Sequence, residues 1–155
     1  LLGNEYNYIV TMPNTPISVC EGVLLCEENH RLKAEQLECF MSIFTAVATV
    51  EFIESKLFSV AGAISGCGPA FVAMFIEALG DAGVKYGLKR DVAYKLASKV
   101  VSGTGELQLA TGVHPAAMKD AVCSPGGTTI KGVASLEEDG FRAAVIKAID
   151  AIENK

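Results

Sequence analysis

Hydrophobic positions in the first third of the chain follow the patterns of a small sheet with one helix. Tyr8–Met12 is a β-prone run that is closed by the two prolines of Pro13–Pro16. Two further apolar runs, Gly22–Cys26 and Thr49–Ile53, predict a second and a third strand. Between these runs, apolar residues recur every three or four positions, as on one face of a helix. They are Leu37, Phe40, Met41, Phe44 and Val47. The order strand, strand, helix, strand predicts the end of an α/β sheet.

From Ser55 onward the apolar positions follow a helical period, so we place a domain boundary near residue 54. Leu57–Ile64 predicts a short helix that breaks at Gly66–Pro69, with Pro69 as the first residue of the next helix. That next helix has almost no polar face before Glu77, which predicts burial on all sides, partly against another chain. Its apolar residues are Phe71, Val72, Met74, Phe75, Ile76 and Leu79.

Four more helices are predicted toward the C-terminus. The first opens at Arg90, and two glycines inside it, Gly103 and Gly105, are typical of a close helix crossing. Its apolar face consists of Val92, Leu96, Val100 and Leu107. The other three begin after His114, at Ser124–Gly127, and after Gly140. The last has the clearest stripe, made of Phe141, Ala144, Val145, Ala148, Ile149 and Ile152.

Composition excludes several classes of protein. The 155 residues are 50% hydrophobic and 20% charged with a net charge of −5, which fits a globular chain and not a disordered one. Basic residues are spread singly, so we expect no nucleic-acid partner. The longest apolar stretch, Pro69–Ile76, is far shorter than the roughly 18 residues of a membrane span, so we expect no membrane. Five cysteines without a CxxC pair indicate free thiols and a cytoplasmic location.

The segment Ser124–Thr129 carries the strongest chemical signal. A serine able to cap, a proline suited to the first helical position and two glycines predict a helix start with free backbone N–H groups. The helix dipole there favours a carboxylate or a phosphate, and the hydroxyls of Thr128 and Thr129 add directional groups. The alternative is an ordinary capped helix start without a ligand.

Other candidate residues carry weaker signals. Ser65–Ala70 has the same order of small residues ahead of a proline, but here a tight bend between helices is the favoured interpretation over a second helix start facing the same pocket. Cys67 has no partner histidine for nucleophilic catalysis, so we interpret it as a structural thiol. Neither His30 nor His114 shows metal-ligand spacing, so we expect no metal site. No GxGxxG nucleotide fingerprint is present in the chain.

Five motifs in the same order resemble those of the pyrroline-5-carboxylate reductases, and the match spans nearly the whole chain. A further similarity lies in Leu136–Arg142. The motifs are Met12–Pro16 (MPNTP), Ser65–Ala70 (SGCGPA), Glu77–Val84, His114-Pro115 and Ser124–Ile130 (SPGGTTI).

The resemblance implies a fold and an activity. Members of that family reduce 1-pyrroline-5-carboxylate to L-proline, the last step of proline biosynthesis, with NADPH or NADH. Residues 1–54 would then be the last strands and one helix of a Rossmann domain. Residues 55–155 would be an all-helical dimerisation and substrate-binding domain, so that the chain is mainly α. A homodimer, built in some members into a ring, is the implied assembly. The glycine fingerprint would lie upstream of Leu1, so the chain alone is expected to be an inactive fragment.

The resemblance also assigns roles to individual residues. The substrate carboxylate would be held at the positions Ser124, Gly126, Gly127 and Thr128, and the hydroxyl of Thr129 would bond the ring nitrogen as the catalytic group. Asn14 would lie near the nicotinamide of the cofactor.

The chain departs from the family pattern at three places. Cys67 and Cys123 stand where serine or threonine is usual, so a polar role of these side chains is not carried over. Gly112-Val113 lacks the carboxylate usual before His114-Pro115.

Two other functions stay open at this point. The chain could be a helical oligomerisation module without catalysis. It could also belong to a β-hydroxyacid dehydrogenase, which would need a catalytic lysine, and the helices after the SGCGPA and SPGGTT motifs offer only Lys131.

Overall fold

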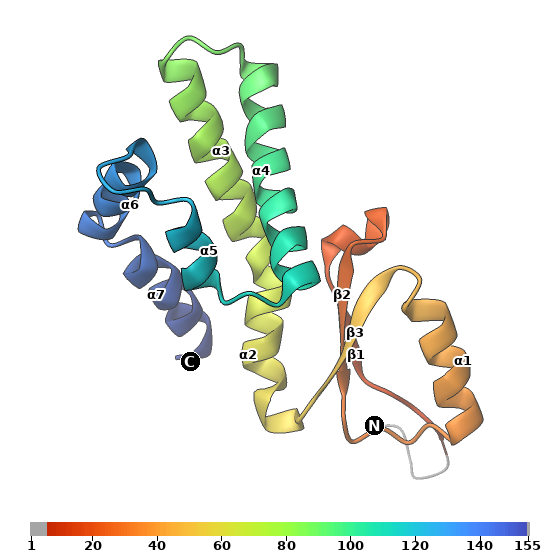
Figure 1. Ribbon diagram of the computed structural model, residues 1–155. Helices are drawn as coiled ribbons and strands as arrows, with labels where there is room; N and C mark the ends of the chain where they lie inside the picture. Colours follow the sequence, from red (N-terminus) through yellow and green to blue (C-terminus); the bar gives the residue numbers. More distant parts are fainter. Residues whose placement is uncertain (1–5, 155) are drawn as a thin grey trace. The chain divides into compact units, whose positions relative to one another are not determined.

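The computed structural model describes residues 6–154, which divide into two compact units (Figure 1). Unit 1 comprises the residues up to Phe71 and those from Ile149 onward, and unit 2 comprises Val72–Ala148. Residues 1–5 and 155, which belong to the two expected domains, lie outside the described residues. The division at Phe71 falls inside a helix, and a domain boundary near residue 54 stays a prediction.

The elements of unit 1 are β1 (Thr11–Pro13), a 3-10 turn (Thr15–Val19), β2 (Gly22–Glu27), α1 (Ala34–Phe44), β3 (Ala48–Ile53), a second 3-10 turn (Ser55–Leu57), α2 (Phe58–Gly62), a π-turn (Ala63–Cys67) and the start of α3 (Gly68–Lys85).

The three strands form one sheet in the order β1-β2-β3. β1 pairs antiparallel with β2, because the short connection between them only reverses the chain. β2 pairs parallel with β3, because α1 carries the chain back across the sheet between them. The strand expected over Tyr8–Met12 begins later, at Thr11, and includes Pro13. Pro13 is tolerated there because β1 is an edge strand of this sheet.

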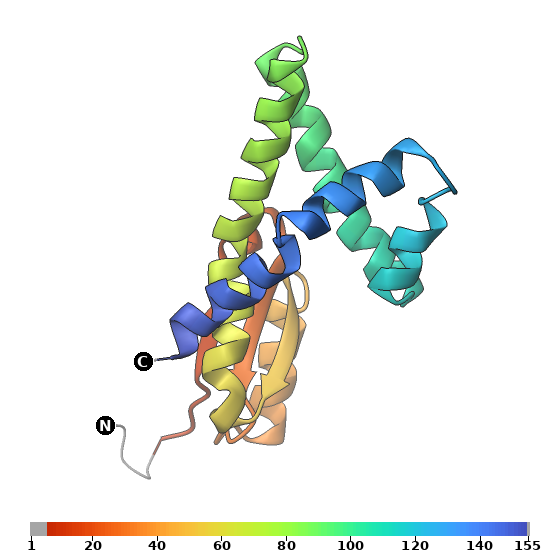
Figure 2. The same ribbon diagram turned by 90° about the vertical axis from the view of Figure 1, so that its left-hand side faces the viewer.

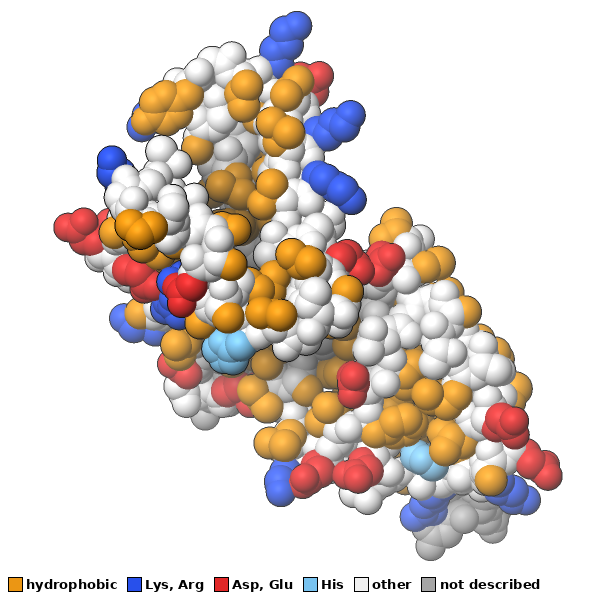
Figure 3. Space-filling view, viewed as in Figure 1, with side chains coloured by type: hydrophobic (Ala, Val, Ile, Leu, Met, Phe, Trp, Pro, Cys, Tyr) orange, Lys and Arg blue, Asp and Glu red, His pale blue; other side chains and the backbone are white. Residues whose placement is uncertain are grey.

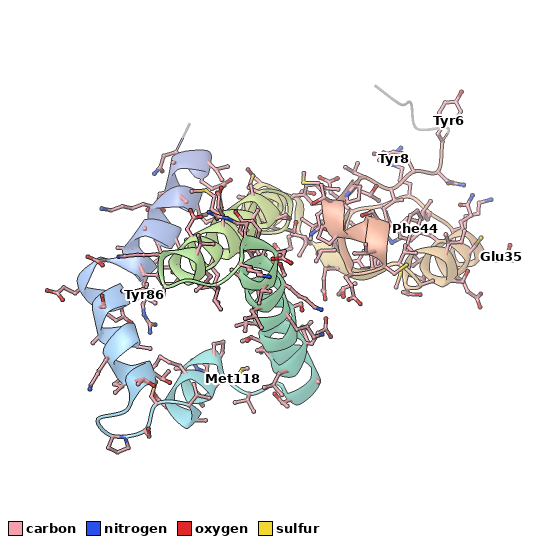
Figure 4. The ribbon with its side chains drawn as sticks, turned by 90° about the horizontal axis from the view of Figure 1, so that it is seen from above. Tyr6, Tyr8, Glu35, Phe44, Tyr86 and Met118 are labelled. Carbon is pink, nitrogen blue, oxygen red and sulfur yellow. The ribbon has the colours of Figure 1, made fainter. Side chains whose placement is uncertain are left out.

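The core of unit 1 surrounds β2. Leu24 and Cys26 are almost completely buried, and Leu25, which points to the opposite face, is buried as well. Burial on both faces explains why β2 has a continuous apolar run instead of an alternating one. Phe40 and Phe44 of α1 pack against this core with their ring centroids 4.6 Å apart (Figure 4). The predicted amphipathic helix is therefore confirmed, although it ends at Phe44 and leaves Val47 outside.

Burial raises the pKa of the Cys26 thiol above its ordinary value of 9.0. The folded state thus prefers the neutral thiol, while the unfolded chain ionises it at lower pH. Stability from this group is complete below about pH 9 and is lost as the pH rises toward the higher pKa of the folded state. We expect the free energy of unfolding, measured by urea titration between pH 8 and 10, to fall less steeply in Cys26→Ala than in the parent chain. Equal slopes in both proteins would contradict the assignment.

The chain from Ser55 to Lys85 is one uninterrupted helical segment of 31 residues. The predicted break at Gly66–Pro69 is therefore wrong. A π-turn passes through this stretch without ending the helix, and Pro69 lies one residue inside α3 instead of opening a separate helix. By length and composition alone this segment is long and apolar enough to cross a membrane. The expectation of no span rested on the uninterrupted apolar stretch Pro69–Ile76, which is only the middle of this longer apolar helix.

Unit 2 consists of the rest of α3, α4 (Arg90–Thr111), α5 (Pro115–Ala121), α6 (Thr128–Glu138) and most of α7 (Phe141–Glu153). α3 and α4 lie side by side as an antiparallel pair (Figures 1 and 2). The two helices pack closely because α3 has glycines, which lack a Cβ atom, at the contact with α4. A Cβ atom on Gly80 would lie 2.4 Å from the ring of Tyr94, and one on Gly83 would lie 3.0 Å from Cβ of Ala93. Arg90 extends the contact with a hydrogen bond to Asp81.

The helices of unit 2 bury little of their apolar surface within the chain. In this unit the buried residues among those described are three small ones, Gly80, Ala93 and Ala97. The predicted burial of α3 on all sides is wrong for the single chain, because Met74 is 68% exposed and Phe75, Val72 and Leu79 are exposed as well. Figure 3 shows hydrophobic side chains gathered over these helices.

The apolar face of α4 is exposed in the same way. Leu96 and Val100 are 54% and 59% exposed, and Val92 and Leu107 belong to the same face. A Cβ atom on Gly103 or Gly105 would meet no neighbouring atom within 4 Å, so the expected helix crossing does not occur within the described chain. These faces are available to another molecule.

Candidate functional site

The chain between α5 and α6 forms a tight turn over Ser124–Gly127. The amide of Gly127 donates to the carbonyl of Ser124 over 3.0 Å, and Gly126 has φ of +69°, the conformation that favours glycine at the third position of a type II turn. Pro125 holds the second position. The expectation that Ser124 caps the helix and Pro125 opens it is therefore wrong, because Gly127 is the N-cap and has no side chain to cap with.

The N-terminus of α6 is consequently open. The amide hydrogens of its first turn, from Thr128 onward, have no partner within the helix, and no side chain of the N-cap residue covers them. Thr128 and Thr129 are exposed, and the loop lies at the edge of unit 2 in Figure 2. A Cβ atom at Gly127 would lie 2.4 Å from Oγ and 3.1 Å from the carbonyl oxygen of Ser124, so the turn closes tightly on this glycine. This arrangement can receive a small anion on backbone N–H groups.

Charged side chains near the turn are paired with one another. Lys119 forms an ion pair with Asp120, and Arg142 binds Glu137 over 2.6 Å. The hydrogen bond that Lys119 donates to Asp120 raises the pKa of Lys119; Cys123 raises it slightly further, and Arg142 lowers it slightly. In each of these two ion pairs the positive and the negative charge sum to zero. These two pairs add no net charge, so within the turn the groups that attract an anion are the open amides at the start of α6.

Asn14 follows β1 in unit 1, and its side chain is engaged on both sides. Its Oδ1 accepts a hydrogen bond from the amide of Val23 over 2.8 Å, and its Nδ2 donates to the carbonyl of Ser65 over 3.0 Å. The amide thus ties the carboxyl end of β1 to β2 and to the π-turn. One hydrogen of Nδ2 is left for a further acceptor, and contact of Asn14 with a cofactor stays a prediction.

Ser65 was not among the site residues expected from the sequence. Its Oγ is buried and has no hydrogen-bond partner among residues 6–154, the part of the chain that the structure describes. A signal for an unusual backbone at Ser65 was present in the sequence, because Pro69 four positions later has no amide hydrogen for the carbonyl of Ser65.

The two histidines are occupied by local hydrogen bonds. Nδ1 of His30 accepts from the amide of Leu32, and Nδ1 of His114 accepts from the amide of Ala116 at the start of α5. No group of three or more potential metal ligands occurs within residues 6–154. Cys67 and Cys123 are half-buried free thiols.

Comparison with known proteins gives the family. Residues 55–155 match the family described as "Pyrroline-5-carboxylate reductase dimerisation". The chain belongs to this family. It is 49% identical over 144 residues to the pyrroline-5-carboxylate reductase of Treponema pallidum and 45% identical over 148 residues to that of Escherichia coli, which cover 93% and 96% of the chain. The recognition of the family from its motifs is confirmed.

Solved structures of the family have the same fold. The pyrroline carboxylate reductase of Plasmodium falciparum, crystallised with NADP bound, superposes with a TM-score of 0.87 at 37% identity and covers 97% of this chain. The enzyme of Coxiella burnetii gives a TM-score of 0.90 at 33% identity over 99% of the chain. The expected fold, a helical dimerisation domain after part of a Rossmann sheet, is confirmed. The chain spans 60% and 57% of these two structures and 55% of both bacterial relatives.

Proposed function

We propose that this chain is the substrate-binding and dimerisation part of a pyrroline-5-carboxylate reductase, which reduces 1-pyrroline-5-carboxylate to L-proline with NADPH or NADH. The observation that carries the proposal is the exposed Ser124–Gly127 turn at the open N-terminus of α6. The names of the relatives and their identity of 49% and 45% over 144 and 148 residues support it. In this proposal residues 1–54 belong to the nucleotide-binding domain and residues 55–155 to the helical domain. A cytoplasmic location is part of it, supported by five cysteines without a disulfide.

The turn and α6 bind and orient the substrate. The carboxylate of the imine is held at Ser124, Gly126, Gly127 and Thr128. The Gly127 amide closes the turn, so the hydrogen bonds come from the open amides that begin at Thr128, where the helix dipole stabilises the charge. The hydroxyl of Thr129, in the first turn of α6, donates a hydrogen bond to the ring nitrogen and orients it, while the proton that this nitrogen gains on reduction comes from solvent. Catalysis by these residues is mainly positioning, because the reacting atoms need only be aligned.

The nicotinamide cofactor, when bound, supplies the hydride for the imine carbon. Its carboxamide is neutral and both donates and accepts hydrogen bonds. Unit 1 offers groups that suit it just after β1, where Asn14 and Ser65 are hydrogen-bonded to each other. These groups are the remaining hydrogen of Asn14 Nδ2 and the unpartnered hydroxyl of Ser65. The residues present therefore fit the nicotinamide end of the cofactor.

A second copy of the chain is the partner that we propose for the exposed apolar faces of α3 and α4. The description of the family as a dimerisation domain supports homo-oligomerisation. The same pairing accounts for the long apolar segment Ser55–Lys85 without a membrane, because another helical surface covers it as well as lipid does.

The experiment that tests the proposed function removes the hydroxyl of Thr129. The chain is fused to the C-terminus of the part of the Treponema pallidum relative that it does not match, which gives the joined protein. Reduction of 1-pyrroline-5-carboxylate by this protein is followed through the absorbance of NADPH. Thr129→Val keeps the shape of the side chain and loses one hydrogen bond, so we expect kcat/KM to fall about 5- to 150-fold, equivalent to about 1–3 kcal/mol.

Thr129→Ser is the matched control, because it keeps the hydroxyl and is expected to retain most of the activity. Unchanged kcat/KM in Thr129→Val would remove Thr129 from the site. If the joined protein assembles but binds neither L-proline nor NADPH, the proposed enzymatic function is contradicted. The chain would then be a helical oligomerisation module without catalysis.

A further inference from the structure

Three unusual features coincide in the helical segment Gly62–Pro69 of unit 1. The carbonyl of Ser65 is bound by a side chain from outside the helix, the hydroxyl of Ser65 has no partner among the described residues, and the helix widens into a π-turn at Ala63–Cys67. π-turns inside helices are uncommon and occur frequently at functional sites. We call Ala63–Cys67 the Ser65 turn.

The first feature follows from Pro69. Proline has no amide hydrogen, so the carbonyl of Ser65, four residues earlier, cannot make its ordinary helical hydrogen bond. Nδ2 of Asn14 donates to this carbonyl over 3.0 Å. Asn14 therefore replaces the missing backbone donor and fastens the Ser65 turn to the end of β1.

The hydroxyl of Ser65 is the second feature. A buried hydroxyl without a partner destabilises a protein, because its hydrogen bonds to water are lost on folding and not replaced. An alanine would avoid this cost, and alanines already stand within the segment and directly beside it, at Ala63, Ala61 and Ala70. Because the hydroxyl makes no hydrogen bond among residues 6–154, rotation about the Cα–Cβ bond of Ser65 can turn it toward a ligand without breaking one.

The chemistry of the segment favours a neutral polar ligand group. Residues 57–76 contain no charged side chain. The amides of the Ser65 turn belong to a continuous helix and form no open N-terminus of the kind that binds phosphate. A serine hydroxyl can donate and accept, which suits a carboxamide better than a carboxylate or a phosphate.

We propose that the hydroxyl of Ser65 hydrogen-bonds the carboxamide of the nicotinamide cofactor and that Asn14 positions the Ser65 turn for this contact. The proposal rests on the proposed function, since it assigns the cofactor as ligand. The location supports it, because the helix packs against the end of β1 so closely that a Cβ on Gly62 would lie 2.8 Å from Sδ of Met12. Asn14 follows directly after that strand.

The first experiment measures cofactor binding and stability in the joined protein described above. Dissociation constants are determined by fluorescence for NADPH and for 2′-phospho-ADP-ribose, which lacks the nicotinamide ring. We expect Ser65→Ala to weaken NADPH binding about tenfold, as for one lost hydrogen bond, and to leave binding of 2′-phospho-ADP-ribose unchanged. The thermal midpoint without cofactor is expected to stay the same or rise, because the variant removes an unpartnered buried hydroxyl.

Ser59→Ala is the matched control. Ser59 lies on the same helical segment and donates to Glu153, so its loss is not expected to change either dissociation constant. If the joined protein binds neither ligand, the proposed function fails. If it binds both and Ser65→Ala binds NADPH as tightly as the parent, the proposed function stands and the assignment of Ser65 is overturned.

The second experiment separates positioning by Asn14 from direct contact. Asn14→Asp removes the donor to the carbonyl of Ser65 and is expected to weaken NADPH binding. Pro69→Ala supplies a backbone amide hydrogen for the same carbonyl, so the double variant is expected to recover most of the affinity. Absence of recovery, in a double variant that is folded by circular dichroism, contradicts the positioning role.

Discussion

Replacing Leu96 and Val100 of α4 by aspartate is expected to convert the assembled protein into monomers. Both side chains are more than half exposed in the single chain and lie on one apolar face of the helix. Covering this face with a second copy would bury two unpaired carboxylates, which costs several kcal/mol in an apolar contact. We expect the dissociation constant of the assembly to rise about 1,000-fold or more, which corresponds to about 4 kcal/mol.

Sedimentation equilibrium over a range of protein concentrations measures this effect. The matched control is the double variant Lys95→Asp and Lys99→Asp, which places the same residues one position earlier on α4, away from the apolar face. The control is expected to assemble like the parent. The proposed interface is wrong if Leu96→Asp with Val100→Asp keeps the mass of the parent, or if the parent is monomeric at micromolar concentration.

Gly22→Ala is expected to lower the free energy of unfolding by about 3 kcal/mol or more, at the upper end of the usual cost of overpacking. Gly22 opens β2, and a Cβ atom there would lie 2.7 Å from Cβ and 2.8 Å from Cα of Ile17. Backbone of the 3-10 turn must then move, and with it the contact between that turn and the central strand. Urea unfolding followed by circular dichroism gives the measurement.

Gly62→Ala is the control for this substitution. Its Cβ would approach Met12 just as closely, with Sδ at 2.8 Å, but the contacted atoms belong to the end of a flexible side chain. We expect a change within about 1 kcal/mol, because the repacking of methionine is offset by the higher helix propensity of alanine. Equal losses for the two variants would show that the approach of Ile17 is not the cause.

Local patterns predicted most of unit 1 correctly. The runs Gly22–Cys26 and Thr49–Ile53 are strands, and the helical period between them is α1, because each signal depends on neighbours within a few residues. The same holds for the opening of α4 at Arg90 and of α5 after His114. Prediction failed at Gly66–Pro69, where small residues and a proline normally end a helix. The donor that keeps the helix intact there comes from Asn14, 51 positions away in the sequence.

The candidate site shows a different kind of error. Ser124 and Pro125 fit a cap and a first helical residue, but Pro-Gly at the two central positions is also the signature of a type II turn. The turn prevails because Gly126 adopts a positive φ, which shifts the N-cap to Gly127. The segment remains a helix start with open amides, and anion binding at these amides stays a prediction.

The sequence by itself determined the strands and the helix of residues 22–53, the family, and the position of the helix start that we propose as a carboxylate site. These depend on residue type and spacing, which act over one or two helical turns. The tertiary structure alone decided that the helix continues through Pro69, that the hydroxyl of Ser65 is left without a partner among the described residues and that the apolar faces of α3 and α4 are uncovered. Each of these features depends on contacts between residues that are distant in the sequence. A hydrogen bond or a packed face exists only where the fold brings both partners together.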